Sequence, residues 1–104
     1  MLKMPLADAL NQLEQYTTEF HRVLDHGDWD VGIYRPESRD SQTAHQRDEL
    51  YVVAVGQGTF FYDGERQPFR AGDAFFVPAG IDHRFEDFSD DFAAWVIFFG
   101  ARSH

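Results

Sequence analysis

Two histidines and a glutamate in this chain have the types and the spacing of a metal site. Glu49 follows His45 by four positions, and His83 lies further along, after the turn segment 78–82. An even separation places two side chains on the same face of an extended strand, so we expect His45 and Glu49 to point the same way. Imidazole is a borderline ligand and carboxylate a hard one, and together they suit Zn, Mn, Fe, Ni or Cu. If the three side chains converge inside a barrel, they would bind a divalent ion and leave an open position for catalysis or for a ligand.

The chain that must position these residues has 104 positions, which favours a single domain over residues 1–104. Pro5 suits the first turn of a helix, and Asp8 complements the positive end of the helix dipole. The apolar residues that recur at helical spacing are Leu6, Ala9, Leu10, Leu13 and Tyr16. We therefore predict one short amphipathic helix over about residues 5–16, followed by a β domain over about residues 17–100.

From Thr17 onward the pattern changes to short apolar or alternating runs separated by turn residues. The runs predicted as strands are Phe20–Leu24, Trp29–Tyr34, Glu49–Val55, Thr59–Tyr62, Ala74–Val77, His83–Phe85 and Phe92–Phe99. The irregular stretch 35–46 is expected to form a loop leading into the strand that carries Glu49. If Tyr51, Val53 and Val55 point into the interior, Glu49 points there as well. So many short strands are typical of an all-β sandwich or small barrel.

The residues around the candidate ligands form two spaced motifs. In chain order the motifs read His45-x3-Glu49-x6-Gly56 and Gly72-x5-Pro78-x-Gly80-x2-His83-x3-Asp87. They resemble the two sequence motifs of the cupin superfamily, which are small β-barrels of the jelly-roll type. The resemblance covers roughly Gln42 to Asp87. It implies an all-β, single-domain cupin jelly-roll barrel of the small conserved-barrel type, preceded here by the short N-terminal α-helix.

The resemblance also implies a set of ligands. In metal-binding cupins the first motif usually supplies two histidines and a glutamate, and the second motif supplies a third histidine. His45, Glu49 and His83 match the last three of these, whereas Thr43 stands where the first histidine would be. Water could take that place. Gln42 is a further candidate ligand only if the backbone bulges, because its odd offset from His45 otherwise sends it to the opposite face.

Aromatic side chains are candidates for the wall of a substrate pocket, although in so small a barrel they first of all form the core. The pocket candidates, including an aspartate in place of the closing asparagine of the second cupin motif, are Tyr34, Tyr51, Phe60, Phe75, Phe85 and Asp87. Arg47 and Arg70 could bind an acidic substrate at the mouth of the barrel. Asp48 is expected to lie in solvent, on the opposite face from Glu49.

Charge and composition exclude several classes of partner. Eighteen acidic residues against nine basic ones give a net charge of −9, which repels nucleic acid and anionic lipid surfaces. The absence of cysteine excludes thiolate metal sites and confines a metal to histidine and carboxylate ligands. The longest apolar run, Phe92 to Phe99, is too short to cross a bilayer, so we expect a cytoplasmic protein. With nucleic acid and anionic membranes set aside, the expected partner is a small-molecule ligand.

Two of the predicted strands are apolar on both faces. These are the segments Tyr51–Val55 and Phe92–Phe99. One face of an antiparallel sheet usually meets water, so the second face must be covered by the edge of the other sheet, by the helix or by another subunit. We favour a homodimer on this ground.

Three functions remain open at this point, because the fold does not choose between them. The first is metal-dependent enzymatic chemistry on a small oxygen-bearing metabolite such as a sugar or an organic acid. Iron would favour dioxygenase-like chemistry, and zinc or manganese would favour isomerase-like, lyase or hydrolytic chemistry. The second is non-catalytic binding or sensing of a small molecule with a degenerate metal site. The third is a structural dimeric barrel. The sequence identifies no dedicated acid or base, although Tyr34, Gln42 or Asp87 could serve.

Overall fold

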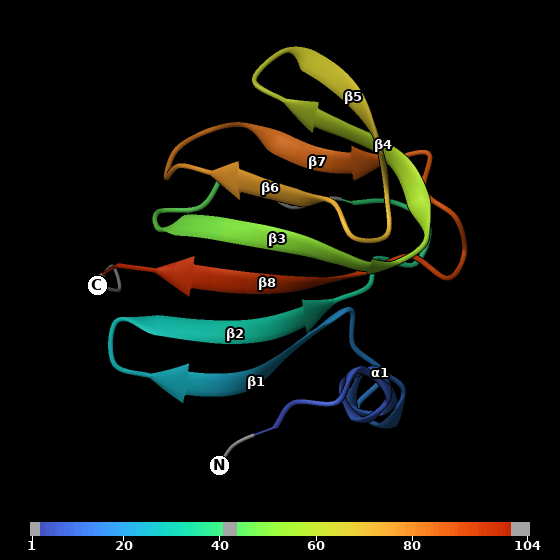
Figure 1. Ribbon diagram of the computed structural model, residues 1–104, viewed down its shortest axis with the longest axis vertical. Coiled ribbons are helices and arrows are strands. Elements are labelled where there is room, and N and C mark those ends of the chain that lie inside the picture. The colour runs from blue at the N-terminus through green and yellow to red at the C-terminus, as the bar shows by residue number, and fades with distance from the viewer. Residues whose placement is uncertain (1–2, 41–43, 101–104) are drawn as a thin grey trace.

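The computed structural model describes residues 3–40 and 44–100 of the chain. These residues contain one helix and eight strands, joined by turns and loops (Figure 1). In chain order they are α1 (Leu6–Gln15), β1 (Phe20–His26), β2 (Trp29–Tyr34), β3 (Asp48–Val55), β4 (Gln57–Tyr62), β5 (Glu65–Arg70), β6 (Ala74–Val77), β7 (His83–Glu86) and β8 (Ala93–Phe99). The expected all-β fold with a short N-terminal helix is confirmed. Within the described ranges, α1 is too short and too polar to span a membrane.

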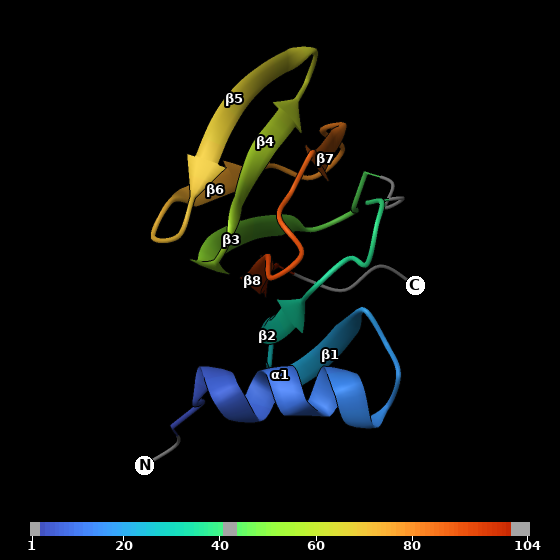
Figure 2. The same cartoon turned by 90° about the vertical axis from the view of Figure 1, so that its right-hand side faces the viewer.

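The strands form two antiparallel sheets. The larger sheet has the order β1-β2-β8-β3-β6, and the smaller has the order β5-β4-β7. In Figure 2 the smaller sheet lies at the top of the view, and α1 lies at the bottom, beneath β1 and β2. Glu49 pairs with Val77 and Phe98, and Tyr51 pairs with Phe75, as neighbours across the larger sheet. Directly paired residues share a face, so these side chains line the inside of the barrel.

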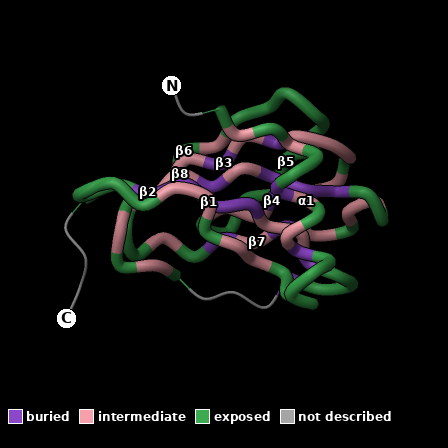
Figure 3. The backbone as a smooth tube through the Cα atoms, turned by 90° about the horizontal axis from the view of Figure 1, so that it is seen from below, coloured by how far each residue is buried: buried purple, intermediate pink, exposed green. Residues whose placement is uncertain are grey.

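Aromatic rings fill most of the space between the sheets. The ring of Phe85 lies 4.7 Å from that of Phe92, 4.8 Å from Phe60 and 4.9 Å from Tyr51, measured between centroids. All four residues are at most 2% exposed. Buried segments therefore run through the middle of the molecule, and exposed segments lie at its periphery (Figure 3). The many phenylalanines noted in the sequence form the core of this small barrel.

The helix α1 covers one end of the outer face of the larger sheet. Ala9 and Leu13 are buried against Ile33 and Ala93, and Trp95 packs at the edge of this cluster. The helix ends at Gln15, where Thr17 then takes a left-handed conformation with φ of 51°. The observed helix, Leu6–Gln15, lies within the predicted range of about 5–16. The helix supplies part of the cover that the two-sided apolar strands need.

Strand β5 was not expected from the sequence. It contains Pro68, which cannot donate to a sheet, and only Phe69 among its six residues is buried. The strand lies at the edge of the smaller sheet and pairs with β4 alone among the described strands. An edge strand tolerates both proline and exposed polar side chains. The described residues therefore form eight strands, one more than the seven runs singled out in the sequence.

Val55 departs from the expected alternation. Tyr51 and Val53 are buried inside the barrel, but the register between β3 and β8 shifts between Val53 and Val55. Val55 packs instead against the cluster under the helix. Such a bulge changes the direction of the side chains beyond it. The condition that Tyr51, Val53 and Val55 all point inward is therefore met by Tyr51 and Val53 but not by Val55, and Glu49, before the bulge, lies inside the barrel.

Candidate metal centre

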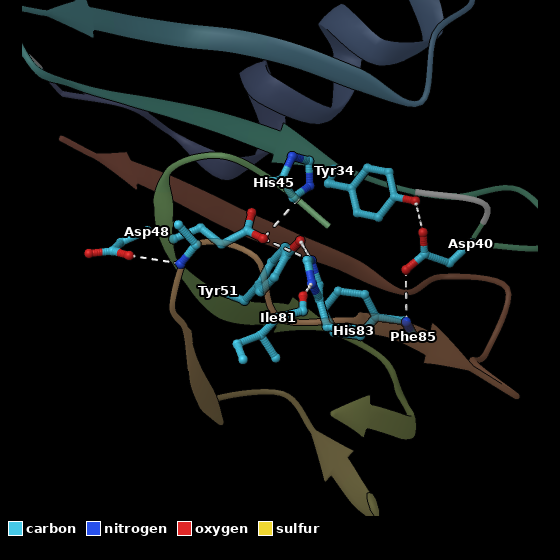
Figure 4. A network of polar contacts seen from close by, with 10 residues as sticks. Tyr34, Asp40, His45, Asp48, Tyr51, Ile81, His83 and Phe85 are labelled. Carbon is cyan, nitrogen blue, oxygen red and sulfur yellow. Dashed lines mark hydrogen bonds and ion pairs between the residues drawn. The ribbon is translucent and has the colours of Figure 1, made fainter. Parts of the chain in front are cut away.

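His45, Glu49 and His83 lie together at one end of the barrel interior. One ligand atom from each lies within 4.8 Å of the other two. Nε2 of His83 is 2.8 Å from Oε1 of Glu49, and Nε2 of His45 is 3.7 Å from the same oxygen. The side chains of Glu49 and His83 are 0% exposed, and that of His45 is 33% exposed. The three residues thus converge as their types and spacing suggested, and His45 forms the side that opens outward (Figure 4).

His45 reaches this position by a different route from the one expected. It lies in the loop before β3, and bends at Gln46 and Arg47 separate it from the strand. Its carbonyl oxygen accepts a hydrogen bond of 2.8 Å from the backbone N–H of Gly80. The same-face argument therefore does not apply to His45, because the residue is not on an extended strand. A backbone contact with the turn before β7 positions it instead.

Asp48 makes a second contact between the start of β3 and the turn before β7. Its Oδ1 accepts a hydrogen bond of 2.8 Å from the backbone N–H of Ala79 (Figure 4). Asp48 is exposed, as expected, but it is not merely solvated. Because Asp48 precedes Glu49 and Ala79 lies in the turn before His83, this bond ties the two ligand-bearing strands together at the site.

The tautomer of His83 is fixed by its surroundings. Its Nδ1 lies 2.8 Å from the carbonyl oxygen of Ile81, which can only accept a hydrogen bond. Nδ1 therefore carries the hydrogen, and in the neutral ring Nε2 presents a lone pair to Glu49. With His83 neutral, neither buried oxygen of Glu49 has a hydrogen-bond donor among the described residues. A buried carboxylate without a donor is costly, and a cation between it and two imidazoles removes that cost.

The electrostatics of His83 point the same way. Burial disfavours its imidazolium form, but the carboxylate of Glu49 and the carbonyl of Ile81 favour it and together raise the pKa of His83 above the usual value. A proton on Nε2 thus satisfies Glu49 when no other cation is present. The donor set fits a divalent ion, which would take the place of this proton.

The phenol of Tyr51 borders the same site. Its hydroxyl group lies 3.1 Å from Nε2 of His83, and its ring is buried among the core aromatics. Tyr51 was expected only as a pocket wall. It also brings a hydroxyl group, able to donate or accept a hydrogen bond, to the edge of the triad.

Comparison with known proteins identifies the family. Residues 31–99 match the Cupin domain. The chain belongs to the cupin family. It is 34% identical to an uncharacterised protein of Streptomyces coelicolor over 70 residues, which cover 65% of this chain and 67% of that protein. The sequence-based resemblance to small conserved-barrel cupins is confirmed.

Solved structures show the same fold. KdgF from Halomonas sp. superposes with a TM-score of 0.70 at 21% identity, over 81% of this chain and 79% of that chain. A putative mannose-6-phosphate isomerase from Ralstonia eutropha superposes with a TM-score of 0.66 at 19% identity, over 80% and 83% of the two chains. At this level of identity the likeness shows the cupin fold alone.

Asp40 is a buried residue of this cupin that the sequence did not single out. Its Oδ1 accepts a hydrogen bond of 2.7 Å from the hydroxyl of Tyr34, and its Oδ2 accepts one of 2.8 Å from the backbone N–H of Phe85. Burial and the neighbouring Asp40 carboxylate raise the pKa of Tyr34 far above its usual range. Tyr34 therefore keeps its proton, which is directed to Asp40, and is a poor candidate for a base.

Arg47 has a structural role that the sequence did not suggest. Its guanidinium donates to Asp30 at 2.6 Å, to the carbonyl of Asp28 at 2.8 Å and to that of Gly100 at 3.1 Å. These bonds involve all three nitrogens and hold the loop before β3 against β2. Burial opposes the ionised form of Asp30, but Arg47 and Arg22 outweigh it and lower the pKa of Asp30. Arg47 is thus engaged in contacts within the protein, whereas the sequence had suggested only that it could bind an acidic substrate.

The remaining candidates fall in different places. Phe60 and Phe85 lie in the core, and Phe75 stacks on Phe60 with centroids 4.2 Å apart. Asp87 is exposed in a left-handed turn with φ of 49°. Arg70 is also exposed. Gln42 and Thr43 lie outside the described residues.

Proposed function

We propose that this cupin binds a divalent metal ion through His45, Glu49 and His83 and acts on, or binds, a small oxygen-bearing metabolite there. The ion would be Zn, Mn, Fe or Ni. The observation that carries the proposal is the buried carboxylate of Glu49, which faces two imidazole nitrogens and has no hydrogen-bond donor among the described residues while His83 is neutral. A cation is the group that this arrangement accommodates best.

The bound ion would supply Lewis-acid chemistry, or oxygen activation if it is iron. Glu49 and His83 form a buried pair that fixes one side of the site, and the Ile81 carbonyl holds the ring of His83 in the ligating tautomer. The partly exposed His45 borders the side from which a metabolite enters. The hydroxyl of Tyr51 can hydrogen bond to a bound oxygen. Isomerase-like and dioxygenase-like reactions are the classes to test, and the structurally similar Ralstonia protein is a putative mannose-6-phosphate isomerase.

A second candidate is non-catalytic binding or sensing of a small molecule, with a degenerate metal site. Thr43 stands at the place of the first histidine, so the chain offers three of the usual four cupin ligands. The contacts of His83 with Glu49 and Tyr51 also give the buried groups partners in the metal-free protein once His83 is protonated. This candidate requires ligand-induced stabilisation that does not depend on metal.

Elemental analysis separates the two candidates. Protein purified without an affinity tag should contain about one equivalent of a divalent metal, and the variant His83→Ala should lose it. His26→Ala is the matched control, because His26 is exposed on the β1–β2 hairpin, outside the triad. Protein that holds no metal and gains no thermal stability from added Zn, Mn, Fe or Ni would overturn the metal proposal.

We also propose a class of partner, a cellular location and an oligomeric state for this protein. The net charge of −9 argues for a small-molecule partner over nucleic acid or an anionic membrane surface. We propose a cytoplasmic homodimer, and fractionation of the source cells with an antibody to the chain tests the location.

A further inference from the structure

A small apolar cavity opens beside the triad. It measures about 230 Å³ and is lined by Phe20, Tyr34, His45, Tyr51, Val96 and Phe98. Strand pairing places the lining residues of β1, β2, β3 and β8 on the inner face of the larger sheet. His45 and Tyr51 belong both to this lining and to the surroundings of the triad. A molecule bound at the open side of the proposed ion would therefore extend into this cavity.

The lining offers little to a polyhydroxylated molecule. The hydroxyl of Tyr34 points away to Asp40, as Figure 4 shows, and that of Tyr51 lies against His83. Phe20, Val96 and Phe98 present only hydrocarbon. A sugar hydroxyl buried among these groups would lose water without gaining a partner, which weakens binding.

One wall of the cavity depends on the absence of a side chain. The ring of Phe20 lies over Gly32, and a Cβ atom at Gly32 would lie 2.3 Å from Cε2 of Phe20. This allows Phe20 to meet Phe98 edge-on, with ring centroids 6.1 Å apart. Gly32 therefore permits an aromatic wall where any larger residue would displace the ring.

Resting on the proposed metal site, we propose that the ligand is an organic acid with an apolar body about the size of one aromatic ring. Its oxygen-bearing head would bind at the triad, and its body would fill the cavity. A cavity of about 150 Å³ holds a benzene molecule, so about 230 Å³ accommodates one ring with a short substituent. Of the two substrate classes, sugar and organic acid, this cavity favours an acid with an apolar side chain.

Three α-hydroxy acids with the same chelating head test the proposal. Glycolate carries the head alone, mandelate adds a phenyl ring, and gluconate adds a polyhydroxylated chain. Zn²⁺-loaded protein is titrated with each acid by NMR, which detects weak binding. Mandelate should bind about tenfold or more tightly than glycolate, because the phenyl ring leaves water. Gluconate should bind no more tightly than glycolate.

Variants locate the effect. Phe20→Ala removes one wall and Gly32→Ala displaces the ring that forms it, so each should reduce the preference for mandelate to about threefold or less and leave glycolate binding unchanged. Tyr16→Ala is the control, because Tyr16 is a 61% exposed ring outside the cavity. The ratio of two affinities measured on one sample is insensitive to a loss of folded protein.

The outcomes separate the two proposals. Equal binding of mandelate and glycolate, tighter binding of gluconate, or an unchanged preference in both cavity variants would overturn the apolar ligand and leave the metal site standing. No binding of any of the three acids to protein that holds stoichiometric Zn²⁺ would overturn the open coordination position and, with it, the inference that rests on it.

Discussion

Nε2 of His83 lies 2.8 Å from Oε1 of Glu49, and both side chains are completely shielded from solvent. The hydrogen of the neutral His83 ring is committed to the carbonyl of Ile81. Two lone pairs therefore face each other unless a proton or a metal ion lies between them. This relationship predicts that the stability of the protein depends on pH, with opposite signs for the metal-free form and for the proposed metal-bound form.

The metal-free protein should lose stability as the pH rises. The pKa of His83 is raised in the folded protein, so its imidazolium stabilises the fold. This contribution is complete below the unfolded-state pKa of about 6.5 and disappears as the pH rises through the higher folded-state value. Each unit of elevation corresponds to about 1.4 kcal/mol. Urea unfolding in EDTA between about pH 5.5 and 8.5 measures this loss of stability. The change in unfolding free energy with pH should vanish in His83→Ala and persist in His26→Ala.

The Zn²⁺-loaded protein should show the reverse dependence. Metal binding requires neutral imidazoles, and the pKa of His83 is raised, so the stabilisation by Zn²⁺ should grow as the pH rises over the same range and be smallest at its acid end. Thermal unfolding with and without Zn²⁺ at each pH checks this. Stabilisation by Zn²⁺ that is equal at both ends of the range would contradict a site made of His45 and His83.

Glu49→Gln should separate folding from metal binding. The glutamine amide can donate to Nε2 of His83, so the buried contact is kept. The free energy of unfolding should therefore change by less than about 1 kcal/mol near pH 8. The loss of the charged ligand should weaken Zn²⁺ binding by about 100-fold or more. Competition against a chromogenic chelator measures the affinity. Glu65→Gln, on the exposed edge strand, is the control and should bind Zn²⁺ as the wild type does.

Asp40→Ala should be strongly destabilising although Asp40 lies in a loop. The substitution leaves the Tyr34 hydroxyl and the Phe85 N–H without their acceptor, at a cost of about 2 kcal/mol or more. The control is Asp90→Ala, which removes an exposed carboxylate and should change the free energy of unfolding by less than about 0.5 kcal/mol. If equilibrium denaturation gives equal values for the two variants, Asp40 does not stabilise the loop.

The outer face of the larger sheet should be the contact between two copies of the chain. Leu50, Phe76 and Ile97 are paired neighbours on this face, and Trp29 pairs with Phe99 beside them. Phe76 is 55% exposed and Trp29 41% exposed, which is unusual for large apolar residues that share one face. Sedimentation at micromolar concentration should show a dimer that Phe76→Ser dissociates. A monomeric wild type would contradict the proposal.

The parts of the molecule set by local sequence were predictable, and the parts set by distant contacts were not. The helix follows from the spacing of its apolar residues, and the two motifs bring Glu49 to His83 because each lies on a strand with buried alternate positions. Strand β5 was missed because its residues meet solvent and Pro68 argues against a strand unless the strand is known to be an edge. That knowledge comes only from the assembled sheet.

The two least predictable contacts join residues far apart in the chain. Asp40 meets the N–H of Phe85, which lies on the outer strand of the smaller sheet, 45 positions later. Arg47 meets Asp30, 17 positions earlier. No spacing rule encodes either pairing, and the ion pair with Asp30 could not be inferred from the position of Arg47 in the sequence.

The three candidate ligands also differ in how firmly the chain holds them. Glu49 and His83 lie on strands of opposite sheets, whereas His45 lies in the loop before β3, held by the backbone hydrogen bond to Gly80. Two donors on strands and one in a loop would allow the distance to the third donor to adjust to ions of different radius. We therefore propose that the site would accept more than one metal, and that the metal bound in the cell would depend on supply more than on geometry.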